Sequence, residues 1–388
     1  MNNGQNKQQI KKAISDFYVW QKAGKSYQKN GPSALLRAYG KYKKTAPTSV
    51  QTAAAKQSGF VPANPVNAYD TAYMCPVTIG GSTVNLDFDT GSADLWTFST
   101  QQSALSTVSH LLYNTTSSGT LIPGLSWGIT YADGSSASGN VYNDTMTVGN
   151  VTATGQAIEV ATTASSAFTS ATYDGILGLG FDTLNMVTPT RQATFFDNVK
   201  SSLETALFTA NLQKNAPGSY TFGYLNASQY TGPITYAPVD PSAGWWAFNM
   251  TGYSTGNAAA TPYEPYIGVV DTGTTLLVLP QDIVAAYWGQ VANASYSSTY
   301  GGWTFPCAAT LPSWSAVIGG AAQTVPGSYL NYGPVDNAGN CFGGMQQNDG
   351  IGFSIYGDVF LKSQFVVFDQ SQATPRVGFA KQVGVDYS

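Results

Sequence analysis

Short stretches in which apolar and polar residues alternate run along the chain from Tyr73 onward. In one of them, residues 77–79 lead into Gly80-Gly81, and a second alternating run follows over residues 84–88. Alternation of this kind favours a strand with one buried face, and a Gly-Gly pair between two such runs favours a tight hairpin. The pattern therefore predicts a β-hairpin at the beginning of this region.

A second hairpin is predicted further along the chain. Residues 127–131 form an alternating strand that enters a turn at residues 132–135, and residues 138–148 form the returning strand. The turn contains Asp-Gly, a dipeptide that suits the tip of a hairpin because it tolerates positive φ angles.

Helical periodicity is rarer. Residues 194–203 and 281–291 are predicted to form amphipathic helices, and a short helix is predicted to begin at Pro32-Ser33. In that helix Leu35, Tyr39 and Tyr42 fall on one face. Residues 45–59, rich in Thr, Ala, Ser and Gln, are interpreted as an exposed linker suited to cleavage.

Composition supports a chain made mostly of strands. It contains 24 Tyr, 18 Phe, 8 Trp, 41 Gly and 19 Pro residues, which suits many short strands joined by turns. A chain of 388 residues exceeds the size at which one hydrophobic core usually stops growing. The expected fold class is therefore all-β, with two or more domains.

One motif occurs twice. Residues 86–92 and residues 268–274 each run from a β-prone apolar segment into Asp-Thr-Gly and then a hydroxyl residue, which places Asp89 and Asp271 182 positions apart. Each copy is followed later by an apolar-apolar-Gly segment, ending at Gly178 and at Gly357. We interpret this as a duplication of large units and place the boundary between the two halves at residues 232–233.

Two carboxylates held at a shared site have a specific chemistry. At about 4 Å they repel by roughly 4 kcal/mol at an effective dielectric constant near 20, which corresponds to about three pK units. One proton is then shared by the pair over a broad acidic range. The ionised carboxylate takes a proton from a bound water while the protonated one donates to a carbonyl oxygen, which gives hydrolysis without a covalent intermediate.

Other catalytic classes fit the sequence poorly. His110 is the single histidine and is expected to be structural, and no Gly-x-Ser-x-Gly elbow is present. One His and three Cys leave little for a zinc site, so no metal and no cofactor are expected. A two-carboxylate glycosidase remains an alternative, because aromatic-rich β-proteins often bind sugars.

Charge is divided unevenly along the chain. Residues 1–56 contain eleven Lys or Arg and a single acid, Asp16, which gives a net charge of +10. The rest contains six basic and 20 acidic residues, which gives −14. The usual interpretation of a basic tail is an arm that binds nucleic acid, which the acidic body would repel; a tail that folds onto its own body is an equal alternative.

Several features suggest export. Six Asn-x-Ser/Thr sequons are candidate glycosylation sites, and Cys307 and Cys341 form a plausible disulfide, whereas Cys75 is expected to be a buried apolar residue. No apolar run is long enough to span a bilayer, and no signal-peptide core is present at residues 1–4, so a signal peptide is expected to be absent from this chain. The sequons are at Asn114, Asn143, Asn150, Asn226, Asn249 and Asn293.

The duplicated motifs resemble the active-site signatures of the pepsin-type aspartic endopeptidases, most closely the secreted fungal branch of penicillopepsins and aspergillopepsins. The matching residues are 89–96 and 271–275, and the resemblance covers essentially everything after Tyr73. It implies a bilobal β fold with a long cleft, and Asp89 and Asp271 as the catalytic dyad that shares a proton.

The resemblance also implies residues that bind substrate. Tyr131 would lie on a mobile hairpin that closes over substrate, held by a hydrogen bond from Trp96. Asp133 matches the acid that accepts lysine before the scissile bond in similar fungal enzymes, which would allow activation of trypsinogen-like substrates; a turn-forming role is the alternative. The implied substrate-binding set is Gly91, Ser92, Trp96, Tyr131, Asp133, Gly134, Ser135, Gly273, Thr274 and Thr275.

By the same resemblance, residues 1–56 are similar to an inhibitory pro-segment. Lys41-Tyr42 resembles the family's Lys-Tyr pair, in which the lysine lies between the two aspartates. Acid would weaken the attraction between this segment and the body, and cleavage near Lys56 would release the mature enzyme. The expected domains are thus residues 1–56, the N-terminal lobe 57–232 and the C-terminal lobe 233–388.

The sequence therefore predicts a secreted acid endopeptidase in zymogen form. Its expected partners are protein and peptide substrates, its own pro-segment and pepstatin-type inhibitors, and it is expected to be a monomer that binds neither nucleic acid nor membranes. A catalytically inactive pepsin-like binding or inhibitor protein is the main alternative, although such chains usually have a damaged Asp or Gly signature and both are intact here.

Overall fold

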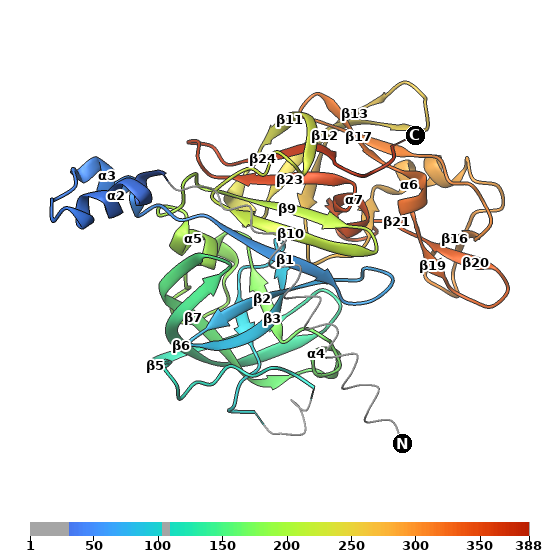
Figure 1. Cartoon of the computed structure of the whole chain (residues 1–388). Helices are drawn as coiled ribbons and strands as arrows, with labels where there is room; N and C mark the ends of the chain where they lie inside the picture. The colour runs from blue at the N-terminus through green and yellow to red at the C-terminus, as the bar shows by residue number, and fades with distance from the viewer. Residues whose placement is uncertain (1–30, 103–108, 388) are drawn as a thin grey trace, which may run out of the picture. The chain divides into compact units, whose positions relative to one another are not determined.

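The computed structural model describes residues 31–102 and 109–387. The chain forms two compact units, residues 1–56 and residues 57–388, and each is described by itself (Figure 1). No helix among the described residues is both long and apolar enough to cross a membrane.

The described part of the first unit consists of helices α2 (Gly31–Lys41) and α3 (Thr48–Ala54). Helix α2 confirms the helix predicted from the apolar stripe. The expectation of a linker over residues 45–59 is wrong for α3 and for Gly59, which begins a strand. Pro47 occupies the N-cap of α3, where its missing N–H costs no helical hydrogen bond, and the Ala and Gln residues that follow favour a helix.

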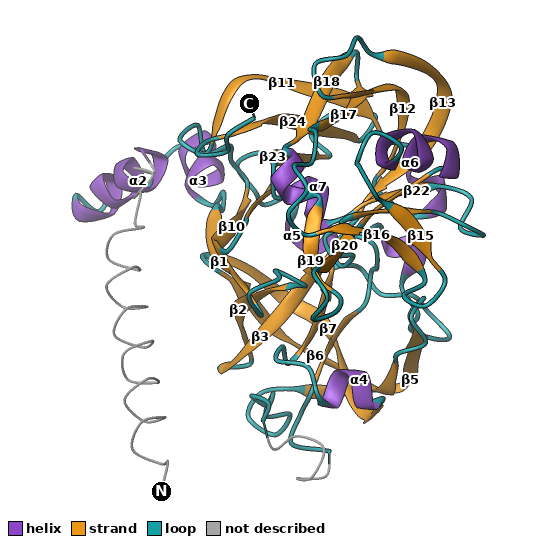
Figure 2. Cartoon of the chain, turned by 90° about the vertical axis from the view of Figure 1, so that its right-hand side faces the viewer, coloured by secondary structure: helices purple, strands orange, loops and turns teal. Residues whose placement is uncertain are grey.

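Strands dominate the second unit, and its helices are short (Figure 2). Its N-terminal strands are β1 (Gly59–Pro65), β2 (Tyr73–Ile79), β3 (Ser82–Asp89), β4 (Leu95–Thr97), β5 (Thr120–Thr130), β6 (Ser136–Val148), β7 (Val151–Ala164), β8 (Gly175–Gly178), β9 (Leu207–Gln213), β10 (Ala216–Phe222) and β11 (Tyr230–Pro238). Its later strands are β12 (Ala247–Thr255), β13 (Thr261–Val270), β14 (Leu277–Leu279), β15 (Ser295–Ser297), β16 (Gly302–Pro306), β17 (Trp314–Ile318), β18 (Ala321–Val325), β19 (Asn331–Pro334), β20 (Asn340–Gly343), β21 (Met345–Gln347), β22 (Ser354–Tyr356), β23 (Gln364–Asp369) and β24 (Arg376–Gln382). The α-helices are α4 (Ser166–Thr169), α5 (Phe195–Val199), α6 (Gln281–Trp288) and α7 (Asp358–Leu361), and the 3₁₀ turns are η1 (Asp182–Leu184), η2 (Pro241–Ala243) and η3 (Gly327–Tyr329).

The strands form three sheets. The largest has 13 strands in the order β11-β24-β23-β9-β10-β1-β2-β3-β8-β4-β7-β6-β5, so strands from both ends of the unit share it. The second has seven strands in the order β18-β17-β12-β13-β22-β14-β21, and the third has four, β15-β16-β20-β19. This mostly β architecture confirms the predicted fold class.

Both predicted hairpins are present. Strands β2 and β3 pair antiparallel across Gly80-Gly81, whose φ angles are +53° and +85°. Strands β5 and β6 pair across residues 131–135, where Gly134 has a φ of +82°. The predicted helices are also present but shorter, as α5 and α6. Hairpin register and turn chemistry are local properties, so the sequence pattern predicts them well.

The duplicated motif has the same topology in each copy. Strand β3, which ends at Asp89, pairs in parallel with β8, so that Asp89 lies opposite Gly178. Strand β13, which ends just before Asp271, pairs in parallel with β22, so that Val270 lies opposite Tyr356. Each Asp-Thr-Gly turn therefore emerges at the end of a central strand and beside its later apolar-apolar-Gly segment.

The predicted boundary at residues 232–233 falls inside β11, where the pairing with β24 is irregular between Thr231 and Thr235. The largest of three clusters of buried apolar residues runs from Val61 to Phe379 and draws side chains from both halves. Cys75 is fully buried in this core as a free thiol, as predicted, and burial raises its pKa well above the usual value.

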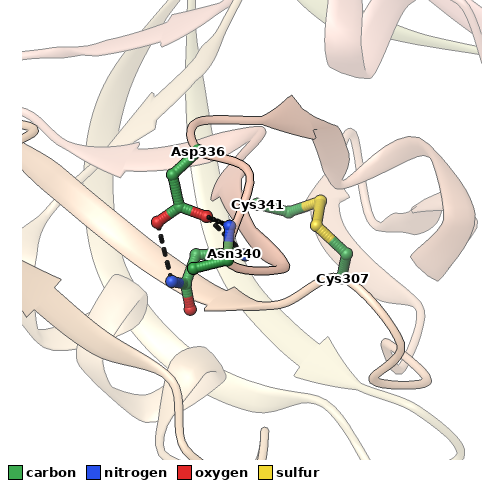
Figure 3. The surroundings of a disulfide bond; sticks show 5 residues. Cys307, Asp336, Asn340 and Cys341 are labelled. Atoms are coloured by element: carbon green, nitrogen blue, oxygen red, sulfur yellow. Dashed lines mark hydrogen bonds between the residues drawn. A yellow bond between two sulfur atoms is a disulfide. The ribbon is translucent and has the colours of Figure 1, made fainter.

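The predicted disulfide between Cys307 and Cys341 is present, with Cα atoms 5.0 Å apart (Figure 3). It joins the loop after β16 to β20. Beside it, Asp336 accepts hydrogen bonds from the backbone N–H and the side-chain amide of Asn340, at 3.0 and 2.8 Å. The small four-stranded sheet is thus held by one covalent link and one polar turn.

Candidate active site

The two Asp-Thr-Gly turns interlock through their threonines. The N–H of Thr90 donates to Oγ1 of Thr272, and the N–H of Thr272 donates to Oγ1 of Thr90, both at 3.1 Å. Each hydroxyl then donates across the junction, Thr90 to the carbonyl of Val270 at 2.8 Å and Thr272 to that of Phe88 at 2.5 Å. All of these groups are buried, so the two turns are fixed to each other.

This interlock brings each carboxylate against the glycine of the opposite turn. A methyl group added to Gly91 would lie 2.6 Å from Oδ1 of Asp271, and one added to Gly273 would collide with the carboxylate of Asp89. Only glycine permits an approach this close. The structure thus brings together the two aspartates that the sequence paired across 182 positions.

Each carboxylate is oriented by an equivalent pair of hydrogen bonds within its own turn. In the first turn, Oδ1 of Asp89 accepts the N–H of Gly91 at 2.7 Å and Oδ2 accepts the hydroxyl of Ser92 at 2.5 Å. In the second, Oδ1 of Asp271 accepts the N–H of Gly273 at 2.9 Å, and Oδ2 accepts the hydroxyl of Thr274 at 2.6 Å. In each motif, the hydroxyl residue that follows Asp-Thr-Gly thus donates to the aspartate of the same turn.

Burial raises the pKa of Asp89 well above its usual value, and the charge of Asp271 adds to the effect. The hydroxyl of Ser92 and the N–H of Gly91 act in the opposite direction because they stabilise the ionised form. Because the effects that raise the pKa of Asp89 outweigh those that lower it, Asp89 retains a proton while Asp271 carries the charge. The pair can therefore supply an acid and a base at once.

The hydrogen bond expected between Trp96 and Tyr131 is present. Nε1 of Trp96 donates to the hydroxyl of Tyr131 at 2.9 Å. Both rings pack edge-to-face on Phe168, with centroids 4.8 and 5.5 Å away. Burial and then the charge of Asp89 raise the pKa of the Tyr131 phenol, so this hydroxyl lies within the field of the dyad as a neutral group.

The hairpin tip, residues 131–135, is here called the flap. Oδ1 of Asp133 accepts the N–H of Ser135 at 2.9 Å and its hydroxyl at 2.6 Å. The N–H of Tyr131 donates to the carbonyl of Ser135, and the N–H of Gly134 donates to that of Tyr131. Asp133 therefore has a turn-forming role at the exposed tip.

Other predicted residues are placed as follows. The hydroxyl of Thr275 donates to the carbonyl of Thr71 at 2.7 Å, so it is engaged within the protein. His110 lies 3.4 Å from Asp174 and against the carbonyl of Thr169, which agrees with a structural histidine. Lys41 and Tyr42 lie at the end of α2, where the ammonium of Lys41 is 5.6 Å from the centroid of the Tyr42 ring. Lys56 is the last residue of the first compact unit. Five sequon asparagines are exposed and Asn226 is half-buried.

Four further residues around the dyad were not predicted from the sequence. Thr90 and Thr272 interlock the turns, and their presence at the centre of both motif copies is the signal that could have revealed them. The indole of Trp245 donates to the carbonyl of Gly91 at 3.2 Å. Asp87, two residues before Asp89, is buried, and burial followed by the charge of Asp271 raises its pKa to about 8.

The family model for eukaryotic aspartyl proteases matches residues 72–382. The chain belongs to this family. It is an aspartic-type endopeptidase, and its substrates are proteins.

Curated relatives cover most of the chain. Penicillopepsin-3 from Penicillium janthinellum is 49% identical over 91% of this chain and 89% of its own length. Aspergillopepsin-1 from Aspergillus pseudoglaucus is 52% identical over 92% and 90%, and endothiapepsin from Cryphonectria parasitica is 46% identical over 92% and 88%.

The fold agrees with this assignment. The crystal structure of the aspartic proteinase from Irpex lacteus matches with a TM-score of 0.69 and 27% identity, over 84% of this chain and 98% of that one. The predicted family resemblance and pepsin-like fold are thus confirmed.

Proposed function

We propose that this aspartic endopeptidase cleaves proteins at acidic pH by means of a water molecule activated between Asp89 and Asp271. The observation that carries the proposal is the interlock of the two turns, which places each carboxylate against the opposing glycine. One carboxylate takes a proton from the water as it attacks the scissile carbonyl, and the protonated partner donates to the carbonyl oxygen. As the C–N bond breaks, the first carboxyl group passes the water's proton to the leaving nitrogen and the second takes a proton back from a hydroxyl of the tetrahedral intermediate, so the dyad returns to its singly protonated state.

The residues around the dyad have separate tasks in this scheme. Ser92 and Thr274 keep the outer carboxylate oxygens in place. The flap closes over the substrate, with Tyr131 held by Trp96. Gly91, Gly134, Ser135, Gly273 and Thr275 would line the path of the substrate backbone.

The test is hydrolysis of an unfolded protein at acidic pH, with and without pepstatin. We expect cleavage that pepstatin abolishes. Cleavage that pepstatin does not affect would overturn the proposal, as would the absence of cleavage, which an inactive binding protein or a glycosidase would show.

Secretion is part of the proposal. The disulfide suits an oxidising compartment, and the exposure of five of the six sequons would allow glycosylation there. Mass spectrometry of the protein from culture medium, before and after removal of N-glycans, would test it. A protein confined to the cell and free of glycans would count against it.

We also propose that residues 1–56 inhibit the enzyme until acid triggers their removal. The +10 charge of this segment against −14 for the rest supplies the attraction, and acid removes it by protonating carboxylates. Cleavage near Lys56 would coincide with the boundary between the compact units. N-terminal sequencing after incubation near pH 4 should find a new terminus between Thr45 and Gly59; full activity of the intact chain would refute inhibition.

Lys41 is proposed as the inhibitory lysine. With Lys41→Met, the intact chain should become active, and pepstatin should block this activity. With Lys43→Met, two residues later, the intact chain should stay inactive. Equal effects of the two changes would mean that Lys41 contributes only to the net positive charge of the segment and is not the specific inhibitory residue.

Asp133 is proposed to accept lysine before the scissile bond and thereby to allow cleavage of trypsinogen-like substrates. Asp133→Asn keeps the acceptor oxygen that Ser135 uses but removes the charge. Cleavage after Lys should fall while cleavage after Leu or Phe is unchanged. Equal losses would favour the turn-forming role alone.

A further inference from the structure

Two carboxyl groups outside the proposed catalytic set are buried together beside β4. The side chains belong to Asp94, which precedes β4, and to Glu159 on β7. Both residues are at most 1% exposed. Glu159 lies opposite Trp96 in the parallel pairing of β4 and β7. The pair is therefore adjacent to the tryptophan that holds the flap tyrosine.

One oxygen of each carboxyl group is well satisfied. Nδ2 of Asn185 donates to Oε1 of Glu159 at 2.8 Å and to Oδ1 of Asp94 at 3.2 Å. The N–H of Met186 also donates to Oδ1 of Asp94, at 2.8 Å. The loop over residues 185–186 thus ties both side chains to one point.

The other two oxygens, Oδ2 of Asp94 and Oε2 of Glu159, receive no hydrogen from an N–H or O–H donor in the described part of the chain. The amide of Asn185 holds the two carboxyl groups side by side, and a proton placed between their two unpartnered oxygens would give both groups a hydrogen bond. Neither forms an ion pair with any Lys, Arg or His of residues 31–102 and 109–387. The titratable group that faces them is Tyr131, which is itself neutral.

We propose that Asp94 and Glu159 are positioning residues that share a single proton, and that this proton keeps β4, Trp96 and hence the flap tyrosine in place. Loss of the proton would leave two adjacent anions in a buried site without a counter-ion. The repulsion would separate β4 from β7 and release the hydrogen bond from Trp96 to Tyr131.

The direction of the pH dependence follows from the two groups. Burial raises the pKa of Asp94 to about 6, although the N–H of Met186 and the Glu159 hydroxyl oppose it. Burial and the charge of Asp94 raise the pKa of Glu159 well above its usual value. In the unfolded chain both groups ionise near pH 4. Below about pH 4 the stabilisation by the shared proton is fully present, and above it the folded chain binds more protons than the unfolded chain, so this stabilisation is lost as pH rises through the folded pKa values.

The first test uses Glu159→Gln in the full-length chain. The amide donates a hydrogen to Asp94 as the shared proton does, but it cannot ionise. Samples held between pH 4 and pH 8 are returned to pH 4 and assayed there, which separates lasting damage from reversible titration of the dyad. We expect the midpoint of inactivation to move up by about one pH unit, equivalent to about tenfold slower inactivation at the wild-type midpoint.

Glu264→Gln is the matched control, because Glu264 is exposed on β13 and its change should leave the midpoint where it is. An unmoved midpoint in a folded Glu159→Gln protein would overturn the proposal, as would the same shift in the control.

A second measurement needs no variant. The chain contains three glutamates, Glu159, Glu204 and Glu264, so labelling their carboxyl carbons with ¹³C gives three NMR signals. We expect one of the three signals, that of Glu159, to titrate well above the usual range of a glutamate, which is about pH 4.3. Three titrations near pH 4 would show that no proton is shared.

Discussion

The turn at Asp89 and the turn at Asp271 are held by the same hydrogen bonds, but the residues around them differ. Two positions before the aspartate, the first half has the buried acid Asp87 and the second half has Val269. After the later glycine, the first half has Leu179 and the second half has the buried acid Asp358. The geometry that acts on substrate is thus symmetric, whereas the supporting residues have diverged.

The two halves are also stabilised differently. Around β4 and β7 the first half relies on the carboxyl pair of Asp94 and Glu159, which needs a proton. The second half contains the disulfide, and the buried ion pair between its Lys362 and Asp70 of the first half, 3.0 Å apart, joins the two halves. A covalent bond does not depend on pH in the acidic range. We therefore expect the first half to lose more stability than the second when the pH is raised.

Apart from changes to the two aspartates themselves, the largest effect should come from the two close glycines. Gly91→Ala and Gly273→Ala would each push a methyl group into the opposite carboxylate, and displacement by about 1 Å should lower kcat/KM on the order of 100-fold. If the turns are functionally equivalent, the two losses should be similar.

Gly128→Ala is the control, since a methyl group there meets nothing nearer than Cβ of Ser138 at 3.4 Å. A folded Gly91→Ala or Gly273→Ala protein with unchanged kcat/KM would show that the close approach is unnecessary.

Removal of the disulfide should affect stability more than chemistry. Cys307→Ser with Cys341→Ser opens a crosslink between positions 34 apart, which should lower the free energy of unfolding by about 3–4 kcal/mol. Cys75→Ala, which removes a buried sulfur but no crosslink, should lower it by about 1 kcal/mol. Urea unfolding at pH 4 measures both, and equal losses would indicate that the crosslink contributes little.

The hydrogen bond to the flap should have a moderate effect. Trp96→Phe keeps most of the ring but removes the donor to Tyr131, so kcat/KM should fall about two- to tenfold. Trp127→Phe is the control, because the Trp127 indole stacks on Trp96 but donates to the carbonyl of Val160. Equal losses in the two variants would assign the effect to ring packing.

The smallest effect should come from exchanging the hydroxyl residues of the two turns. Thr274→Ser keeps the hydroxyl that donates to Asp271 and should change kcat/KM by less than about twofold, whereas Thr274→Val should lower it about tenfold. Steady-state kinetics at pH 4 distinguishes the two. A large loss in Thr274→Ser would mean that the methyl group, and not the hydrogen bond, orients the carboxylate.

Local features of this molecule were predictable from its sequence. The hairpin at Gly80-Gly81, the flap and helix α6 follow from periodicity and turn residues, and the dyad follows from a motif present twice. Helix α3 was missed because Pro47 was interpreted as part of a loop when it is the residue at which a helix begins.

Long-range polar contacts were not predictable in the same way. The threonine interlock joins positions 182 apart, and the pairing of Asp94 with Glu159 through Asn185 joins positions 65 apart. No local periodicity encodes such pairs, because they depend on how the completed sheets are brought together.

The central claim is that Asp89 and Asp271 act as one unit that activates water. Kinetics of Asp89→Asn, Asp271→Asn and the double variant on one peptide at pH 4 test it most directly. The account predicts that each single change lowers kcat/KM by about 10³- to 10⁴-fold and that the double change lowers it no further. Losses that multiply in the double variant, or a single variant that keeps most of its activity, would contradict a shared catalytic unit.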